Sequence, residues 1–503
     1  MHTFVDPLYR AQKMFPDKVA AVCGETRLTY AETWSRCRRL AGGLHGLGLQ
    51  SGDRVAIWAA NSHQYLEVYM AVPAAGMVVV PLNTRHAEPE LRYALEDSGT
   101  RVLITDRDPG GLADTVERVI RIPDAYEALV EEAPEMELGV GVTEDTVAGL
   151  FYTGGTTGAS KGVMLTHRNL IANTMNWLIA TQQGPDDAYL VMAPLFHAAG
   201  SLAVLATVWI GGCQVVQPAF EPAEALDLIA SERVTLTLGV PAMIAAITEL
   251  QLVESRDVSS LRFLGHGGSP IATEVVRRAH QAFPKAEMCH AYGATETAPL
   301  ATCLRNEHLV IDSDLGRSCG QAVAGVDVRV FDSDGNELPP GGVGEVVVRG
   351  TNIMKGYWNK PEQTAAALRE SWYYTGDLGY MDALGYVFLV DRAKDMIVSG
   401  GENVYSTEVE EVLYKHPAVL EAAVFGIPDE HWGEAVHAVV VPRPEQAVDA
   451  EALISFCRDY IAGYKIPKGI DFQGEPLPKS GPGKVLKREL RLPYWESSDR
   501  QIN

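Results

Sequence analysis

Short apolar, β-branched runs alternate with longer helical stretches through the first half of this chain. Arg54–Trp58, Met77–Val80 and Val102–Thr105 are expected to be buried strands. The segment Ala59–Gly76, between two of these runs, is expected to be a crossover helix. This alternation is typical of α/β proteins, so the sequence predicts an α/β fold.

The second half of the chain changes character twice. After about Gly316 a smaller β subdomain is expected, with strands at Val326–Phe331, Gly344–Val348 and Gly385–Val390. Near Asp391 helices and strands mix again, with expected helices at Thr407–Leu413 and Ala450–Ile461 and expected strands at Glu421–Phe425 and Val436–Val441. Asp449 is the expected N-cap of the second helix. We therefore expect a large domain, residues 1–391, and a small α+β domain, residues 392–503.

The bulk composition restricts the partners of the chain. Its 503 residues exceed what one hydrophobic core usually supports, which also predicts more than one domain. With 42 basic and 65 acidic residues, the formal net charge is −23. Such an acidic chain is not expected to bind nucleic acid or an anionic membrane as its main partner.

The cysteines and the N-terminus indicate a compartment. The seven cysteines are an odd number and form no CxxC pair, so neither a disulfide framework nor a structural zinc site is expected. The N-terminus has no signal pattern, and the apolar run Ala198–Gly212 is shorter than the ~20 residues of a membrane span. The expected location is the cytoplasm, without a transmembrane segment.

A loop rich in glycine and threonine follows the expected strand Val147–Tyr152 and precedes the expected helix Arg168–Gln182. Glycines let the backbone approach a ligand, and successive N–H groups can then converge on an anion. Hydroxyls and a lysine add donors and charge, so the candidate phosphate-binding residues are Thr153, Gly154, Gly155, Thr156, Thr157 and Lys161. The loop lacks the glycine before the lysine that a Walker A motif has. A surface turn is the alternative.

The loop resembles the phosphate loop of the acyl-adenylate-forming superfamily, which includes acyl-CoA synthetases, nonribosomal-peptide adenylation domains and firefly-type luciferases. Further motifs of this superfamily follow in order along nearly the whole chain, at Leu195–His197, Gly267–Pro270, Tyr292–Glu296, Tyr374–Asp377, Asp391–Asp395, Ser399–Tyr405 and Pro478–Lys484. The resemblance implies an AMP-forming carboxylic acid–CoA ligase. Such an enzyme makes an acyl-adenylate from an acid and ATP and transfers the acyl group to coenzyme A, releasing pyrophosphate and AMP.

The resemblance also assigns roles around the nucleotide. Tyr292 would stack on adenine, Thr295 would donate to phosphate, and Glu296 would hold Mg²⁺ through a carboxylate oxygen. Asp377 would accept hydrogen bonds from both ribose hydroxyls, and Arg392 would add a charged donor. The alternative for Glu296 is a carboxylate on the solvated surface, and the alternative for Asp377 is an aspartate of a turn.

Lys484 is the expected catalytic residue. By resemblance, its ammonium stabilises the charge that develops on the bridging and leaving oxygens during adenylation. Lys479, Lys487 and Arg488 lie nearby in the sequence and are expected to belong to a basic surface tail instead.

The resemblance implies a hinge at Lys394, about which the small domain rotates after adenylation. The segment that contains Gly400 and Gly401 would then help to form a tunnel for the pantetheine arm of coenzyme A. One site would thus carry out both half-reactions in turn.

The expected acyl pocket includes His197, which would lie near the acyl carboxylate as a gate rather than a base. The other expected pocket and nucleotide-site residues are Gly239, His266, Gly267, Gly268 and Gly293. For His266 a packing role is an equal alternative. Small residues suggest room for a branched, cyclic or aryl acid, and a straight fatty acid stays open; they are Ala198, Ala199, Gly200, Gly267 and Gly268.

Two residues depart from the superfamily pattern. Gly154 stands where serine is usual, so one hydroxyl donor to phosphate is missing. We hypothesise that this slows adenylation and leaves thioester formation intact, which would make a preformed acyl-adenylate the preferred substrate. Ser406 stands where proline is usual, and it is expected to cap the following helix with little functional consequence.

Other functions stay open at this stage. The acceptor could be the phosphopantetheine thiol of a carrier protein, although the sequence looks more like the CoA ligases. A non-catalytic protein that binds nucleotide or acyl-adenylate is a further alternative, against which the joint presence of Lys484, Asp377, Glu296 and Arg392 argues. The sequence does not identify the acid or distinguish a monomer from a homodimer.

Overall fold

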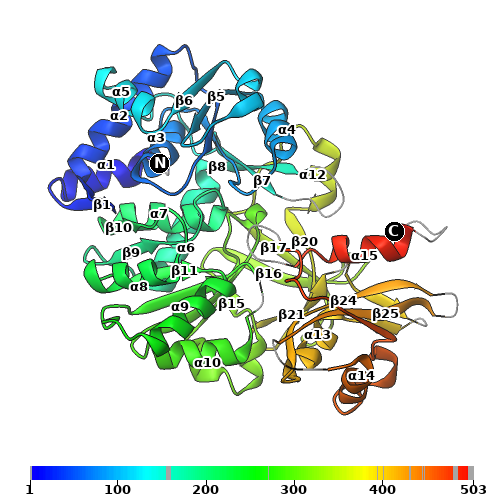
Figure 1. Cartoon of the computed structure of the whole chain (residues 1–503). Coiled ribbons are helices and arrows are strands. Elements are labelled where there is room, and N and C mark those ends of the chain that lie inside the picture. Colours follow the sequence, from blue (N-terminus) through cyan, green and yellow to red (C-terminus); the bar gives the residue numbers. More distant parts are fainter. Residues whose placement is uncertain are drawn as a thin grey trace. The chain divides into compact units, whose positions relative to one another are not determined.

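A computed structural model describes residues 3–153, 160–269, 271–392, 395–399, 402–429, 432–443, 446, 448–479 and 485–496 (Figure 1). The chain divides into two compact units. The first unit contains residues 1–328 and 348–374, and the second contains residues 329–347 and 375–503. The functional boundary expected at Asp391 stays a prediction.

A nine-stranded sheet of the first unit has the order β15-β14-β13-β12-β11-β9-β10-β1-β2. Its central strands are parallel, and β2, β14 and β15 join the edges antiparallel. The strands are β1 (Val19–Cys23), β2 (Thr26–Thr29), β9 (Ala188–Val191), β10 (Cys213–Val216), β11 (Leu236–Gly239), β12 (Phe263–Gly267), β13 (Glu287–Tyr292), β14 (Thr302–Arg305) and β15 (Gln321–Ala322).

A seven-stranded sheet has the order β18-β8-β7-β4-β3-β5-β6. The strands from β7 to β6 are parallel, and β8 and β18 continue the sheet antiparallel. The strands are β3 (Arg54–Trp58), β4 (Val78–Pro81), β5 (Thr100–Thr105), β6 (Arg118–Arg121), β7 (Val147–Thr153), β8 (Lys161–Thr166) and β18 (Gly356–Tyr357). These parallel strands confirm the α/β class.

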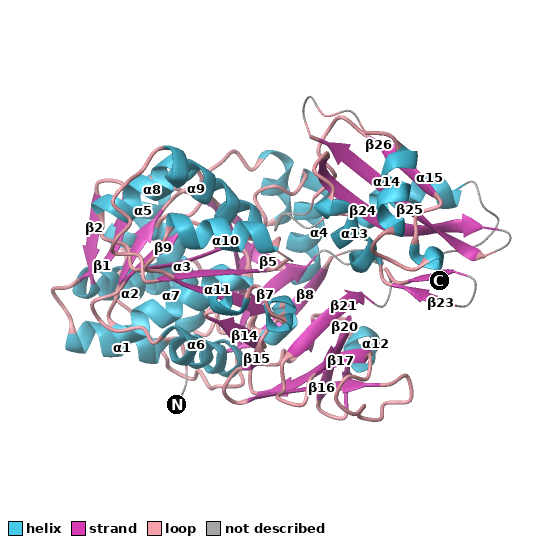
Figure 2. Cartoon of the chain, turned by 90° about the horizontal axis from the view of Figure 1, so that it is seen from below, coloured by secondary structure: helices cyan, strands magenta, loops and turns pink. Residues whose placement is uncertain are grey.

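Helices cover and separate the two sheets. They are α1 (Val5–Met14), α2 (Tyr30–Gly46), α3 (His63–Ala74), α4 (Glu88–Ser98), α5 (Asp124–Glu132), α6 (His167–Thr181), α7 (Ala198–Ile210), α8 (Pro222–Ser231), α9 (Pro241–Val253), α10 (Thr273–Ala282), α11 (Glu307–Val310) and α12 (Pro361–Ala367). Helix α9 contacts β11 and β12. It also contacts α10 (Figure 2). Helices α3 and α7 are apolar on nearly every face and are buried along most of their length. A helix of this kind must pack inside the core, so α7 lies in the main apolar cluster with residues of both sheets.

The remaining strands form two further sheets. One has the order β16-β17-β20-β19, with β21 beside β20; its strands are β16 (Val326–Phe331), β17 (Gly344–Gly350), β19 (Leu368–Arg369), β20 (Trp372–Met381) and β21 (Val387–Arg392). The other has the order β23-β22-β25-β24, with β26 beside β25. Its strands are β22 (Ile397–Ser399), β23 (Glu402–Val404), β24 (Val419–Asp429), β25 (Gly433–Pro442) and β26 (Gly469–Phe472).

The last sheet packs with α13 (Ser406–Lys415) and α14 (Ala450–Arg458) around a separate apolar core, and the C-terminal helix is α15 (Lys487–Glu496). The expected N-cap of α14 is confirmed, because Asp449 Oδ1 accepts a 2.8 Å hydrogen bond from the Ala452 N–H. The expectation that Ser406 caps α13 is wrong. The N-cap is Tyr405, and Ser406 is the first helical residue.

No helix in the described part of the chain is long and apolar enough to span a membrane.

Candidate active site

The candidate phosphate loop connects two antiparallel strands. Thr153 ends β7, Lys161 begins β8, and the two residues face each other in the ladder. The helix expected directly after the loop is preceded by β8, a strand that was not predicted. The start of α6 at His167 is therefore separated from the loop by a strand. Gly154, Gly155, Thr156 and Thr157 lie outside the described residues.

Lys161, Tyr357 and Glu296 lie together beside β8. Strand β18 pairs antiparallel with β8 and so brings Tyr357 to this position. The Lys161 ammonium is 4.7 Å from the centre of the Tyr357 ring, and the Tyr357 hydroxyl donates a 2.8 Å hydrogen bond to Oε1 of Glu296. Burial raises the pKa of Tyr357, and the charge of Glu296 raises it further, so the phenol stays a donor. The structure thus joins the expected phosphate lysine to the expected magnesium carboxylate.

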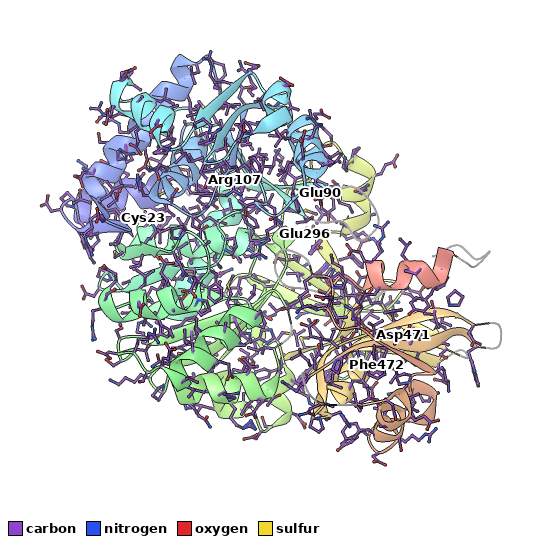
Figure 3. The ribbon with its side chains drawn as sticks, viewed as in Figure 1. Cys23, Glu90, Arg107, Glu296, Asp471 and Phe472 are labelled. Carbon is purple, nitrogen blue, oxygen red and sulfur yellow. The ribbon has the colours of Figure 1, made fainter. Side chains whose placement is uncertain are left out.

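Glu296 and Thr295 lie in a short 3₁₀ helix, Thr295–Thr297, just after β13 (Glu296 is labelled in Figure 3). Tyr292 is the last residue of β13. Between them, a Cβ atom on Gly293 would lie 1.9 Å from the carbonyl oxygen of Pro299. Only glycine fits there, so close packing also explains why the motif has a glycine at position 293.

Two buried asparagines that sequence reasoning missed hold the turn after Glu296. Asn352 Nδ2 donates to the Thr297 and Leu300 carbonyls at 2.8 and 3.1 Å. Asn173 on α6 donates to the same two carbonyls at 3.3 and 2.8 Å. No sequence signal singles out these asparagines, because the contacts span more than fifty positions.

His197 is the N-cap residue of α7, against the ring of Phe196. Burial, together with the charges of the nearby Arg85 and His86, lowers its pKa to about 4. The imidazole is therefore neutral near neutral pH. Its Nε2 is buried and has no hydrogen-bond partner among the described residues. A neutral ring can donate or accept one hydrogen bond, which suits a gate rather than a cationic anchor.

His266 is fully buried on β12, and its Nε2 lies 2.6 Å from Oε2 of the buried Glu307. Its ring stacks on His290 with 4.9 Å between the ring centres. This environment favours the packing alternative for His266 over an open acyl pocket.

The expected pocket glycines differ in the space around them. A Cβ atom on Gly267 would lie 2.4 Å from the Ala291 carbonyl oxygen, and one on Gly239 would lie 2.7 Å from the Met192 methyl group. Gly268 has a positive φ of 82° and no such crowding. Close packing fixes the first two glycines, and backbone conformation fixes the third.

In the second unit, Asp377 and Arg392 are cross-strand neighbours on β20 and β21. Arg392 Nε lies 2.8 Å from Asp377 Oδ1. The Asp377 N–H donates to Thr375 Oγ1 at 3.0 Å, and Thr375 Oγ1 donates to the Val346 carbonyl at 2.7 Å. The pairing of β20 with β21 and these contacts fix the position of the Asp377 carboxylate. A fixed position is what the expected ribose-binding role would require.

The expected catalytic and hinge residues Lys484, Lys394, Gly400 and Gly401 lie outside the described residues. Their flanking residues are described, and one expectation about them is wrong. Lys487 does not belong to a basic surface tail: its side chain is 13% exposed, and its ammonium lies 2.7 Å from Oε1 of Glu410. Lys479 and Arg488 are exposed as expected, and Lys479 also pairs with Glu421.

Comparisons with known proteins match this arrangement. The sequence pattern of AMP-binding enzymes matches residues 8–358, and that of the AMP-binding enzyme C-terminal domain matches residues 408–484. The chain belongs to the AMP-binding enzyme family.

Relatives of this AMP-binding enzyme cover it nearly end to end. It is 43% identical over 492 residues to a feruloyl-CoA synthase of an Amycolatopsis species, covering 96% of this chain and 97% of the relative. It is 36% identical over 507 residues to the fatty acid–[acyl-carrier-protein] ligase ScoC of Streptomyces coeruleorubidus, covering 97% and 96%. The crystal structure of ATP-bound MatB from Rhodopseudomonas palustris matches with a TM-score of 0.90 at 32% identity, covering 97% of this chain and 99% of that one. The expected AMP-forming acid–CoA ligase activity is confirmed, with ATP and coenzyme A as co-substrates.

Magnesium fits the site as a companion of the nucleotide. The described part of this AMP-binding enzyme contains no group of three or more His, Cys, Asp or Glu side chains that could hold a metal by itself. Glu296, oriented by Tyr357, offers one carboxylate. Mg²⁺ is commonly bound by one or two carboxylates, with phosphate oxygens and waters completing its octahedron.

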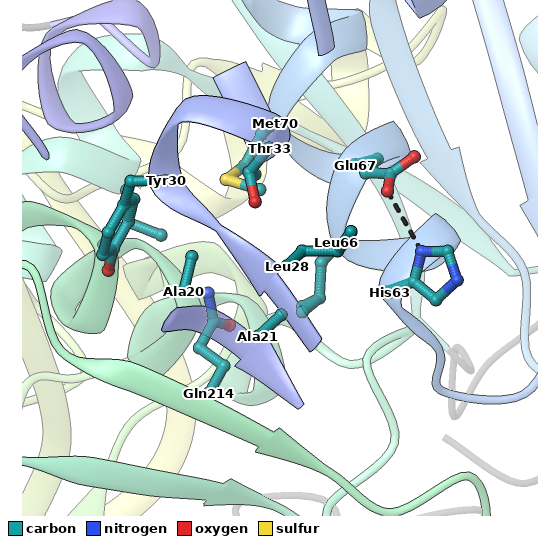
Figure 4. A pocket seen from close by; sticks show the side chains of 11 residues that line it. Ala20, Ala21, Leu28, Tyr30, Thr33, His63, Leu66, Glu67, Met70 and Gln214 are labelled. Carbon is teal, nitrogen blue, oxygen red and sulfur yellow. Dashed lines mark hydrogen bonds and ion pairs between the residues drawn. The ribbon is translucent and has the colours of Figure 1, made fainter. Parts of the chain in front are cut away.

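A cavity of about 10 Å³ lies elsewhere, among residues of β1, β2, β10, α2, α3 and α7 that include Thr33, Glu67 and Gln214 (Figure 4). The buried Glu67 carboxylate beside it lies 3.0 Å from His63 Nδ1 and 2.7 Å from Arg36 Nε. None of the candidate site residues lines this cavity, and its volume suits one water molecule, not an acid.

Proposed function

We propose that this AMP-forming ligase activates an arylpropenoic acid of the ferulate type. The observation that carries the proposal is the 43% identity to a feruloyl-CoA synthase over 96% of the chain, compared with 36% for the fatty-acid ligase ScoC. The small residues Ala198, Ala199 and Gly200 after His197 also support a flat, rigid acyl group.

The proposed roles follow from the site. In the first step an oxygen of the acid carboxylate attacks the α-phosphorus of ATP, the bond to the bridging oxygen breaks, and pyrophosphate leaves. Lys161 and the loop donors would hold the phosphates, Asp377 the ribose, and Lys484 the charge on the leaving oxygen. Mg²⁺ held by Glu296 would neutralise phosphate charge. In the second step the CoA sulfur attacks the acyl carbon and AMP leaves.

The neutral His197 would act on the carboxylate end of the acid. A neutral imidazole can donate one hydrogen bond to the carboxylate without trapping it as an ion pair. This fits a carboxylate that must attack phosphorus in the first step.

A competition among acids tests the proposed substrate. Ferulate, its side-chain-saturated analogue and a medium-chain fatty acid are mixed at equal concentration with ATP, Mg²⁺ and coenzyme A, and the thioesters are counted by mass spectrometry. We expect feruloyl-CoA to exceed the fatty acyl-CoA at least about tenfold, which corresponds to ~1.4 kcal/mol of transition-state discrimination. A product dominated by the fatty acyl thioester would reject the aryl substrate class.

A carrier-protein acceptor is the second candidate, supported by the identity to ScoC. It predicts that a phosphopantetheinylated carrier protein accepts the acyl group faster than free coenzyme A at equal concentration. Thioester formation with each acceptor separates the two.

We further propose a cytoplasmic enzyme with a functional boundary between residues 1–391 and 392–503. The seven cysteines are free thiols, as in a reducing compartment. The two family matches leave residues 359–407 between them, a range that contains the proposed boundary.

A further inference from the structure

Ser406 is the centre of a buried polar network in the second unit. It has no exposed surface and is the first residue of α13. Its backbone N–H donates to Oδ2 of Asp391, and its hydroxyl donates to Oδ1 of Asp391 at 3.1 Å. A proline, the residue usual at this position, could make neither bond. Ser406 therefore ties α13 to the end of β21, where Arg392 follows Asp391.

Lys487 joins the same network from the start of α15. Its ammonium donates to Ser406 Oγ at 2.5 Å and lies 2.7 Å from Glu410 Oε1. Glu410 Oε1 also accepts a 2.8 Å bond from the Val424 N–H. Burial raises the pKa of both Asp391 and Glu410, and the positive charge of Lys487 opposes that rise. A buried ammonium with such partners holds its position more firmly than an exposed lysine could.

The chain is also fixed on either side of residues 480–484. Val485 pairs with Lys479 in an antiparallel bridge, and the Leu486 N–H donates to the Pro478 carbonyl at 2.8 Å. Lys479 is in turn paired with Glu421 on β24, and Val485 packs against an apolar cluster that includes Phe425. Only two residues, Val485 and Leu486, separate Lys484 from the buried anchor at Lys487.

We propose that Lys487 and Ser406 are positioning residues for adenylation, and that they fix the chain carrying Lys484 to the strand carrying Arg392. The inference rests on the proposed function, in which Lys484 acts in the first half-reaction. Transition-state stabilisation by a point charge depends steeply on its position: a displacement of about 1 Å costs up to roughly a hundredfold in rate. The network thus serves the adenylation step and is not needed for transfer to the thiol.

Four variants separate positioning from folding. Ser406→Pro suits the first turn of a helix, because proline has the required φ there, yet it removes both bonds to Asp391. Ser406→Ala keeps the N–H and loses only the hydroxyl. Lys487→Arg keeps the charge. Lys487→Met combined with Glu410→Gln removes the anchor without leaving Glu410 as an unpaired buried charge.

Arg488→Met is the matched control, since it removes a neighbouring exposed cation.

The half-reactions are measured separately on the full chain, with thermal unfolding alongside. Adenylation is followed by acid-dependent exchange of labelled pyrophosphate into ATP, and transfer is followed from synthetic acyl-adenylate and coenzyme A. For Ser406→Pro and the double variant we expect kcat of exchange to fall about ten- to a hundredfold. KM for ATP and the transfer rate should stay within about threefold of wild type. The kcat of exchange for Ser406→Ala should lie between those of wild type and Ser406→Pro. Lys487→Arg and Arg488→Met should keep the rate of exchange within about threefold of wild type.

Two results would overturn the inference alone: undiminished exchange in Ser406→Pro and the double variant, or an equal loss of exchange and transfer in them. A wild-type protein that neither exchanges pyrophosphate nor forms a thioester with any acid would instead reject the proposed function, and the inference with it.

Discussion

The Tyr357 hydroxyl donates a 2.8 Å hydrogen bond to the Glu296 carboxylate across 61 positions of sequence. Strand β18 makes this contact possible by pairing with β8 just beyond the phosphate loop. The same ring lies 4.7 Å from the Lys161 ammonium. One tyrosine thus orients the proposed magnesium carboxylate and contacts the proposed phosphate lysine.

Substitution of Tyr357 by Phe should weaken the use of Mg²⁺. The lost bond is to a charged group and is worth about 1.5–3 kcal/mol, which corresponds to roughly a ten- to hundredfold lower adenylation rate at limiting Mg²⁺. The rate of pyrophosphate exchange as a function of Mg²⁺ concentration measures this loss of adenylation rate in Tyr357→Phe. Tyr126→Phe is the control, because Tyr126 also donates a buried 2.8 Å bond to a carboxylate, that of Glu67, away from the site. An equal Mg²⁺ dependence in both variants would reject the role of Tyr357.

Substitution of Asp377 by Asn should raise KM for ATP. The amide loses the charge and one acceptor oxygen toward the ribose diol, and the ion pair with Arg392 is lost too. We expect an increase of about tenfold, the equivalent of one hydrogen bond to a charged group. Asp382→Asn is the control, since Asp382 accepts bonds from the Leu384 and Tyr386 N–H groups in the β20–β21 turn. Unchanged ATP kinetics in Asp377→Asn would remove Asp377 from the nucleotide site.

Substitution of Gly154 by Ser tests whether the departure in the phosphate loop slows the first half-reaction. If the missing hydroxyl limits adenylation, the restored donor should speed pyrophosphate exchange about ten- to a hundredfold and leave transfer from acyl-adenylate unchanged. No gain in exchange would mean that a backbone N–H or a water already replaces the serine.

The buried side chain of His167 predicts that the folded protein loses stability in mild acid. Burial lowers the pKa of His167 from 6.5 to about 4, so between these values the unfolded chain binds a proton that the folded chain does not. The contribution of His167 to the free energy of unfolding therefore falls by about 2 kcal/mol from pH 7 to pH 5. Urea denaturation at pH 7 and at pH 5 measures the free energy of unfolding. Its decrease between the two pH values should be smaller by about 2 kcal/mol in His167→Gln than in wild type. The exposed His45→Gln is the control, and an equal pH dependence in His167→Gln and wild type would contradict the assignment.

Local patterns in the sequence predicted the strands that are recognisable from their own run of apolar and β-branched residues. The strands Arg54–Trp58 and Val326–Phe331 agree with the structure at both ends. Strand β8 was missed because it follows a glycine loop directly, and its strand character depends on pairing with β7. The motifs also located Asp377 and Arg392, and the antiparallel pairing of β20 and β21 explains why they meet.

Long-range contacts account for what the sequence did not indicate. Tyr357 and Asn352 reach the segment around Glu296 only through the folded chain. Lys487 looked like a solvated lysine in a basic tail, and only the packing of α15 against β24 and the acceptor on Glu410 show that it is buried. Burial of a charge depends on partners distant in sequence, which a local pattern does not contain.

The most direct test of the ligase activity offers ferulate in two forms, as the free acid with ATP and Mg²⁺ and as synthetic feruloyl-adenylate, each with coenzyme A. Mass spectrometry then detects feruloyl-CoA and AMP. The proposed function predicts the thioester and AMP from both forms, and thioester from the adenylate alone would locate a defect in the first half-reaction. The absence of thioester from both forms, for ferulate and for the other acids tested, would contradict the account.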